Sequence, residues 1–250
     1  MDGAAVLRVA TFNLRNGRAW DGCNSWPFRR RASVRTLRGL EADLIGVQEA
    51  FGFQLRWLAR RLPGYDVVGE GRDGRGRGEH CAVLVRRDVF RVMEASTRWF
   101  GPTPPLVSRL PGASFPRVAT IVALAHVSGA RWRFTSTHLD EASADRRRAS
   151  AAQLAEWVRS GDPHVVAGDF NAPPDDPLFD QLAAAGFRHA VPADAGGTSH
   201  RFTGRRDGRR IDHLLVNDSV AVRSAHVAYA PDGERLASDH WPVVAEVSLA

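Results

Sequence analysis

The chain has 250 residues, and its 34 basic residues, all of them arginine, stand against 28 acidic residues to give a formal net charge of +6. A hydrophobic content of 44% is ordinary for a soluble, folded protein. No apolar run approaches the roughly 20 residues that span a bilayer, so we expect no membrane-spanning helix. Two cysteines exclude a disulfide framework, and no secretory leader pattern opens the chain, so we expect a cytoplasmic protein.

The basic charge has two interpretations. Arginine without lysine reflects the base composition of a genome, or it serves attraction to phosphate-bearing substrates, which arginine binds bidentately.

Strand-like and helix-like segments alternate along the chain, with no fixed-period repeat and no break that would separate two domains. We therefore expect one domain over residues 1–250. Strands are expected at 6–12, 43–48, 81–86, 118–126, 131–138, 164–169, 211–216, 222–228 and 242–248, and helices at 30–40, 54–62, 143–159 and 177–185. Glycine, proline and arginine predict loops at 69–79, 101–116 and 192–210. The connection between 118–126 and 131–138 is too short for a parallel crossover and predicts an antiparallel hairpin. Two sheets flanked by helices fit this pattern better than a doubly wound parallel sheet.

Polar residues recur where the expected strands begin or end. Carboxylates, amides and histidines gathered in this way suit hydrolysis at a metal-bound phosphate. In chain order these positions are Asn13, Gln48-Glu49, Thr137-His138, Gly168-Asp169-Phe170-Asn171, Arg210-Ile211-Asp212-His213 and Ser238-Asp239-His240.

The order and spacing of these six motifs, from Val6 to Val247, resemble the endonuclease/exonuclease/phosphatase superfamily, metal-dependent phosphoesterases with the fold of pancreatic-type deoxyribonuclease. The resemblance implies an α/β fold of four layers, an α/β/β/α sandwich in which two mixed β-sheets are flanked by helices. Residues 21–26 with Arg29-Arg30, and His138-Leu139-Asp140 followed by Arg147, resemble a bacterial branch related to the carbon-catabolite-repressor-type enzymes.

The resemblance implies a metal site at Glu49, Asn13 and Asp239. Mg²⁺ is a hard cation that takes oxygen ligands and keeps several waters, so one or two carboxylates suffice. Glu49 ends an apolar strand and needs a partner there. Asn13 is implied as a direct or water-mediated ligand, and Asp239 faces a metal or the attacking water. We expect Mg²⁺, with Mn²⁺ as the alternative.

Asp169 is the candidate that orients or deprotonates the attacking water, and Asn171 the candidate donor to the phosphate. Taken alone, both residues would be explained equally well as turn formers before Pro173. The resemblance assigns His240 to phosphate contact or proton transfer, with Asp212 fixing its tautomer.

The resemblance also implies a second phosphate-binding histidine, His138, supported by Glu79. Arg117 is expected to face the phosphate, although a surface arginine would fit the sequence too. Arg147 and Trp26 belong to the branch pattern and are candidates for substrate binding. Phe202 either stacks on a base or sugar or pins its own loop.

These residues predict hydrolysis of a phosphate ester by an activated water in a divalent-metal-dependent, monomeric enzyme. The first expected substrate is a phosphodiester in nucleic acid or a nucleotide. The alternative is a small phosphorylated metabolite, such as a sugar or nucleoside phosphate. A binding module without catalysis is a third hypothesis, which the full set of acids and histidines disfavours. We expect no membrane partner.

Overall fold

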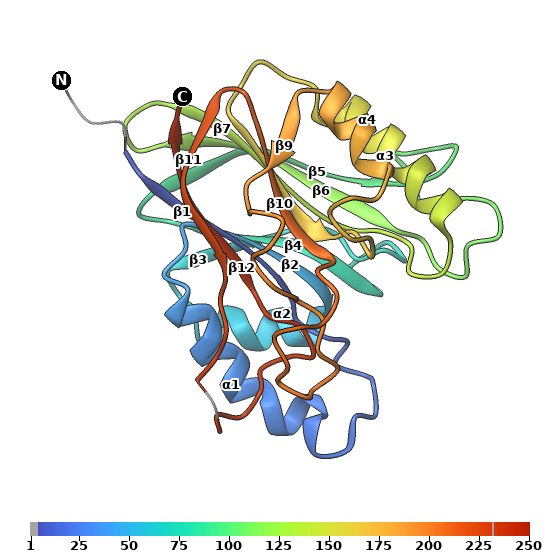
Figure 1. The fold of residues 1–250 in the computed structure, drawn as a ribbon, viewed down its shortest axis with the longest axis vertical. Coiled ribbons are helices and arrows are strands. Elements are labelled where there is room, and N and C mark those ends of the chain that lie inside the picture. The colour runs from blue at the N-terminus through green and yellow to red at the C-terminus, as the bar shows by residue number, and fades with distance from the viewer. Residues whose placement is uncertain (1–4, 232) are drawn as a thin grey trace.

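The computed structural model describes residues 5–231 and 233–250, which form two six-stranded mixed sheets packed face to face (Figure 1). The first sheet has the order β11-β12-β1-β2-β4-β3 and the second the order β5-β6-β7-β8-β10-β9. The strands of the first sheet are β1 (Leu7–Asn13), β2 (Leu44–Phe51), β3 (Tyr65–Val68), β4 (Glu79–Arg86), β11 (Val220–Val227) and β12 (Val243–Leu249). Those of the second are β5 (Phe90–Trp99), β6 (Val118–His126), β7 (Arg131–His138), β8 (His164–Asp169), β9 (Phe187–His189) and β10 (Asp212–Asn217).

Helices cover the outer face of each sheet (Figure 1). α1 (Trp26–Gly39) and α2 (Gly52–Ala59) lie on the first sheet, and α3 (Ala144–Val158) and α4 (Leu178–Ala184) on the second. A short 3₁₀ helix, η1 (Gly22–Asn24), precedes α1. No helix in the described ranges is long and apolar enough to cross a bilayer.

Three apolar clusters separate the four layers. Inward-facing residues of both sheets, such as Val9, Phe134 and Val165, form the central cluster. A second cluster joins the first sheet to α1 and α2 through residues such as Leu37 and Leu58, and a third joins the second sheet to α3 and α4. This arrangement confirms the expected α/β/β/α sandwich.

Three strands were not expected from the sequence. β3 and β9 are short, and β5 is a sheet edge whose burial alternates poorly, so none has the apolar alternation that marks a half-buried strand. The expected hairpin is confirmed, because β6 and β7 pair antiparallel.

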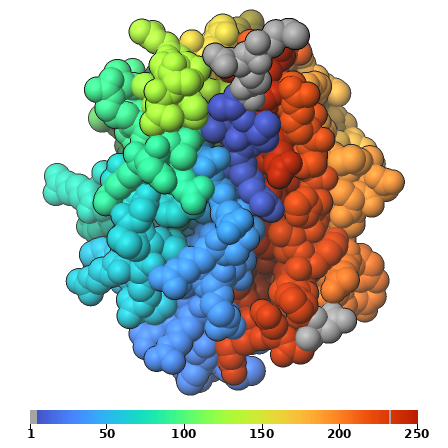
Figure 2. Space-filling view, turned by 90° about the vertical axis from the view of Figure 1, so that its left-hand side faces the viewer, coloured from blue at the N-terminus to red at the C-terminus, as the bar shows by residue number. Residues whose placement is uncertain are grey.

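Strand register brings the polar strand ends together. β1 and β2 run parallel, as do β7 and β8. In the second sheet Asp169 lies directly between His138 of β7 and Asp212 of β10. The first and last strands, β1 and β12, pair antiparallel, and the blue surface near the start of the described chain lies beside the red surface of the C-terminal strands in Figure 2. Residues from both ends of the chain therefore contribute to one edge of the sandwich.

Candidate active site

Glu49 projects from an irregularity in β2. The register of β2 against β4 shifts between Val47 and Ala50, and Glu49 has a φ of 61°. This left-handed backbone costs a non-glycine residue on the order of 1 kcal/mol. The Glu49 carboxylate accepts Asn13 Nδ2 at 2.9 Å and the backbone N–H of Asn16 at 2.8 Å. The bulge thus turns the carboxylate toward the loop that follows β1.

Asn13, the last residue of β1, joins two carboxylates. Its Nδ2 donates to Glu49 Oε1 and to Asp169 Oδ2, both at 2.9 Å, while its Oδ1 accepts the backbone N–H of Arg15. Its amide nitrogen therefore faces the carboxylates, and the side chain holds Glu49 of one sheet beside Asp169 of the other.

Asp169 is buried at the end of β8. The preceding Gly168 allows β7 to approach, because a Cβ there would lie 2.3 Å from the carbonyl oxygen of Thr137. Burial, with the charge of Asp212 as the second cause, raises the pKa of Asp169 to about 7 against the opposing effect of His240. A carboxyl group with that pKa can exchange a proton with water near neutral pH.

His240 pairs with Asp212. Its Nδ1 lies 2.8 Å from Asp212 Oδ2 and 3.9 Å from Asp169 Oδ2. Burial lowers the pKa of His240, but the Asp212 carboxylate outweighs burial and holds that pKa well above its ordinary value. The pair therefore keeps a positive imidazole beside Asp169.

His138 has the opposite character. Asn171, with a φ of 52°, donates through Nδ2 to His138 Nε2 at 3.0 Å and to the Leu139 carbonyl at 3.1 Å. Because the amide donates, His138 accepts at Nε2 and carries its proton on Nδ1. Burial, then the charges of Arg117 and His240, hold the pKa of His138 well below its ordinary value.

Asp239 lies next to the loop that follows β1. Ser238 Oγ donates to its Oδ1 at 3.2 Å, and Arg15 Nε lies 3.6 Å from its Oδ2. Arg15 also makes two hydrogen bonds to Asp21. This arginine therefore spans the acids on the loop side of the site.

Most of these side chains line one cleft of about 880 Å³, with Asn13 and Asp212 buried behind it. Its far wall is the segment 199–211, which an isolated bridge between Ser199 and His240 attaches to the start of β12. The lining includes Arg15, Glu49, His138, Asp169, Asn171, His200, Arg201, Phe202, Arg205, Arg209, Asp239 and His240.

The donor set fits a hard divalent cation. Glu49, His138 and Asp169 offer ligand atoms within 4.8 Å of one another, as do Asp169, Asp212 and His240. One carboxylate oxygen, Asp212 Oδ1, is buried without a hydrogen-bond partner. Carboxylate oxygens are the ligands that Mg²⁺ and Mn²⁺ prefer, so the carboxylates of these groups, above all Glu49, suit such an ion.

Glu79 has direct partners other than His138. Its carboxylate accepts Asn16 Nδ2 at 2.8 Å and pairs with Arg72 at 2.5 Å, and no hydrogen bond in the described chain joins it to His138. Glu79 is therefore bonded to Asn16 and Arg72, although it lines the same small cavity as His138, and its support of that histidine stays a prediction. A carboxylate prefers the cation of Arg72, and Glu79 reaches the cleft through Asn16, whose backbone binds Glu49.

Two of the expected substrate contacts lie outside the cleft. Trp26 is buried in the cluster beneath α1, edge-on to Trp57, because it begins the apolar face of the helix. Arg147 donates to the carbonyls of Asp140 and Glu141 and so fixes the turn before α3. Their assignment to substrate binding is corrected to structural contacts.

The other two expected contacts stay near the site. Phe202 lines the cleft, and Arg117 lines a small adjoining cavity with Glu49, Glu79 and His138.

Arg15, Asn16 and Arg72 were not among the residues expected at the site. The first two follow β1 directly in the polar run Asn13-Leu14-Arg15-Asn16-Gly17, and this run after a buried strand was the available signal. Arg72 stands among two other arginines and five glycines of the loop 69–79, where nothing in the sequence distinguishes it.

The fold and the clustered groups are those of a phosphate-ester hydrolase. A family model described as the Endonuclease/Exonuclease/phosphatase family matches residues 10–240, and the chain belongs to that family. A comparison with curated proteins gives no match.

Solved structures agree with this assignment. An endonuclease/exonuclease/phosphatase family protein from Bacteroides thetaiotaomicron is 27% identical, with a TM-score of 0.91, over 99% of each chain. The mannosyl-6-phosphatase Bt3783 of B. thetaiotaomicron VPI-5482 is 28% identical, with a TM-score of 0.90, over 97% of this chain and 100% of its own. The human Nocturnin catalytic domain, at 19% identity and a TM-score of 0.77 over 100% and 97% of the two chains, shares the fold.

Proposed function

We propose that this cleft hydrolyses a phosphate ester with Mg²⁺ or Mn²⁺ held by Glu49. The observation that carries the proposal is the convergence of Glu49, Asp169 and Asp239, from three distant parts of the sequence, on one cleft. The hydrogen bonds of Asn13 to two of these carboxylates support the same conclusion.

The bound metal supplies a Lewis acid that polarises the phosphoryl group. Asn13 positions Glu49 and Asp169, while Asp239 completes the acidic wall. Asp169 orients the attacking water and accepts its proton, a role suited to its pKa of about 7.

Positive and neutral donors then offset the charge that develops on the phosphate. The His240 imidazolium, kept charged by Asp212, contacts a phosphate oxygen. Asn171 binds His138 and the Leu139 carbonyl with its two amide hydrogens, so it donates to the phosphate by giving up one of these bonds. His138, neutral and bound to Asn171, holds that amide and forms the second wall of the phosphate site.

For the substrate, we propose first a phosphodiester in a nucleotide or single-stranded nucleic acid. The cleft is much larger than one phosphate group, and Arg15, Arg201, Arg205 and Arg209 line it together with Phe202. Arginine binds phosphate oxygens, and a half-buried aromatic ring suits a base or a sugar.

A second candidate is a phosphomonoester of a small metabolite. Similarity over nearly the whole chain to a mannosyl-6-phosphatase favours it. The two substrate classes differ in salt dependence, because only a polyanion releases many counterions on binding.

The test is a panel of single-stranded DNA, RNA, nucleotides and sugar phosphates with Mg²⁺ and with Mn²⁺. We expect activity that a chelator removes and that Glu49→Ala, Asp169→Ala and His240→Ala each lower by at least about 100-fold. Asp66→Ala, which removes an exposed partner of Arg87, is the matched control. Full activity in all three site variants refutes the assignment.

We further propose that residues 1–250 act as one domain and as a cytoplasmic monomer. The central cluster, shared by both sheets, supports a single folding unit, and the scarcity of cysteine suits a reducing compartment. Light scattering after size exclusion tests the monomer, and fractionation of cells tests the location.

A further inference from the structure

Arg29 of α1 is a fully buried arginine without a carboxylate partner. Its exposed fraction is 0%, and it is the largest fully buried side chain among the described residues. Its NH1 donates to the carbonyls of Leu14 at 2.7 Å and Ala237 at 3.0 Å, and its NH2 donates to that of Arg15 at 2.8 Å. Within the described ranges it makes no ion pair, so neutral carbonyls are its direct partners.

The three carbonyls belong to the two chain segments that carry the acidic wall of the cleft. Leu14 and Arg15 follow Asn13 directly, and Ala237 directly precedes Ser238, Asp239 and His240. Ser238 Oγ donates to the Asn13 carbonyl at 2.7 Å, so the two segments also touch each other. One guanidinium thus joins the end of β1 to the approach to β12.

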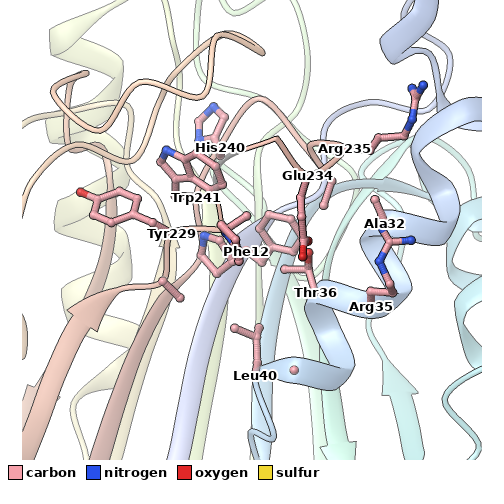
Figure 3. Close-up of a pocket in the computed structure, with 16 residues that line it drawn as sticks. Phe12, Ala32, Arg35, Thr36, Leu40, Tyr229, Glu234, Arg235, His240 and Trp241 are labelled. Carbon is pink, nitrogen blue, oxygen red and sulfur yellow. The ribbon is translucent and has the colours of Figure 1, made fainter.

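The contact between α1 and the second segment is local. Ser33, one turn after Arg29, donates through Oγ to the same Ala237 carbonyl at 2.9 Å. Farther along the helix a cavity of about 360 Å³ lies between α1 and residues 228–231 and 234–237. Figure 3 shows this cavity, with Thr36 of α1 and Leu40 just after the helix on one side and Tyr229 and Trp241 on the other. Arg29 and Ser33 therefore supply the hydrogen bonds that anchor Ala237 to the helix.

The charge of Arg29 belongs to the electrostatics of the cleft. Burial lowers the pKa of Arg29 to about 10, and the charges of Asp239, Asp21 and Glu49 oppose that effect. The acids of the cleft therefore stabilise this buried cation at a distance, and the cation reduces their mutual repulsion.

Lysine cannot reproduce the contact. The planar fork of arginine presents several N–H donors in fixed directions, whereas an ammonium offers donors from a single atom. NH1 of the fork bridges the two segments and NH2 adds the Arg15 carbonyl, so a single ammonium nitrogen cannot bind all three carbonyls from these two positions.

We propose that Arg29 is a positioning residue for the reaction, which holds the segment of Asn13 and the segment of Asp239 and His240 in the arrangement that catalysis needs. The inference rests on the proposed function of the cleft. In this proposal a fully buried side chain, Arg29, controls the geometry of the cleft.

The experiment compares Arg29→Lys, Arg29→Met and Ser33→Ala with the wild-type chain. Arg38→Lys, on the same helix and bonded to the Arg61 carbonyl at the surface, is the control. We measure kcat and KM on the best substrate of the panel, and Mn²⁺ affinity by calorimetry without substrate. Circular dichroism and thermal melting establish that each variant is folded at the assay temperature.

Arg29→Lys keeps the charge and loses the fork, so we expect kcat and Mn²⁺ affinity to fall by roughly 10–100-fold while KM changes little. In Arg29→Met we expect kcat and Mn²⁺ affinity to fall at least as far. In Ser33→Ala we expect both to fall by a smaller factor. Arg38→Lys matches the wild type.

Wild-type kcat and Mn²⁺ affinity in folded Arg29→Lys would overturn the inference. If both Arg29 variants fail to fold, Ser33→Ala decides, and wild-type values in that variant also overturn it. Because Mn²⁺ binding is measured without substrate, a wild type that hydrolyses no ester refutes the proposed function while the calorimetry still tests Arg29.

Discussion

The two ends of strand β8 put buried polar groups to opposite uses. His164 begins the strand, where its ring lies 2.9 Å from Thr135 Oγ1 and 3.2 Å from the Val158 carbonyl. With only neutral partners, burial lowers the pKa of His164 to about 3. Asp169 ends the strand beside His240, whose pKa is raised because Asp212 outweighs burial. Burial alone therefore does not decide whether a histidine is charged, and the partner does.

This contrast assigns different tasks to the two ends. The neutral end contributes hydrogen bonds that stabilise the packing of β8 against β7 and α3. The charged end keeps an imidazolium beside a carboxyl group that titrates near pH 7. Substitutions at each end should therefore separate activity from stability.

The largest effect is expected for Asp212→Asn. The asparagine keeps the shape of the side chain and removes the charge, so the pKa of His240 loses the main cause that raises it. We expect kcat to fall by roughly 10²–10⁴-fold with little change in the melting temperature. Asp66→Asn, at an exposed ion pair, serves as the control. Unchanged kcat in a folded Asp212→Asn enzyme contradicts the charged-histidine role.

His164→Leu should do the reverse. The leucine leaves Thr135 Oγ1 and the Val158 carbonyl without their partner, and such orphaned buried groups cost about 1–3 kcal/mol each. We expect a lower free energy of unfolding in urea and an unchanged kcat for the folded fraction. A loss of kcat without a loss of stability would show that this end of β8 also serves catalysis.

Acid should lower the stability of the folded protein through His164, at the neutral end of β8. The folded pKa of His164 lies below its unfolded value of about 6.5, so below that pH the unfolded chain binds a proton that the folded chain refuses. The contribution of His164 to stability is complete above pH 6.5 and declines as the pH falls toward 3, by up to about 1.4 kcal/mol per pH unit. Urea unfolding at pH 7 and pH 5 should show a smaller acid loss for His164→Leu than for the wild type. Equal losses would exclude His164 as a source.

The smallest effect is expected for His126→Ala. This half-buried histidine ends β6, with its Nδ1 2.7 Å from Ser128 Oγ, and lies outside the cleft. We expect a stability change within about 0.5–1 kcal/mol and wild-type kcat, measured in the same urea and activity assays. A large change in stability or in kcat would mean that burial and hydrogen-bond partners do not determine how much each histidine contributes.

The sequence predicted the layers and most of the strands because their apolar periodicity is strong. It also predicted that Glu49, Asp169 and Asp239 would meet, since each follows or precedes a strand. The bulge that turns Glu49 outward has no marker in the residues around it. It arises from pairing with β4, a partner that is distant along the chain.

Side-chain partnerships were harder to predict than positions. Glu79 was expected beside His138, and the sequence contained no sign that Arg72 would bind it. Trp26 and Arg29 were both noted in the branch pattern, but only tertiary packing separates a core tryptophan from an arginine that binds two loops. Long-range contacts of this kind depend on the folded arrangement and leave no local signature.

The pairing of β1 with β12 has a consequence for synthesis of the protein. Domains form as the polypeptide leaves the ribosome, beginning from its amino terminus. Here β1 cannot complete its pairing until β12 has been made, and Asp239 and His240 directly precede that strand. A chain in which β12 has not yet formed therefore lacks the partner of β1 and the anchored approach to Asp239 and His240, so the first sheet and the cleft are completed in the same late folding step.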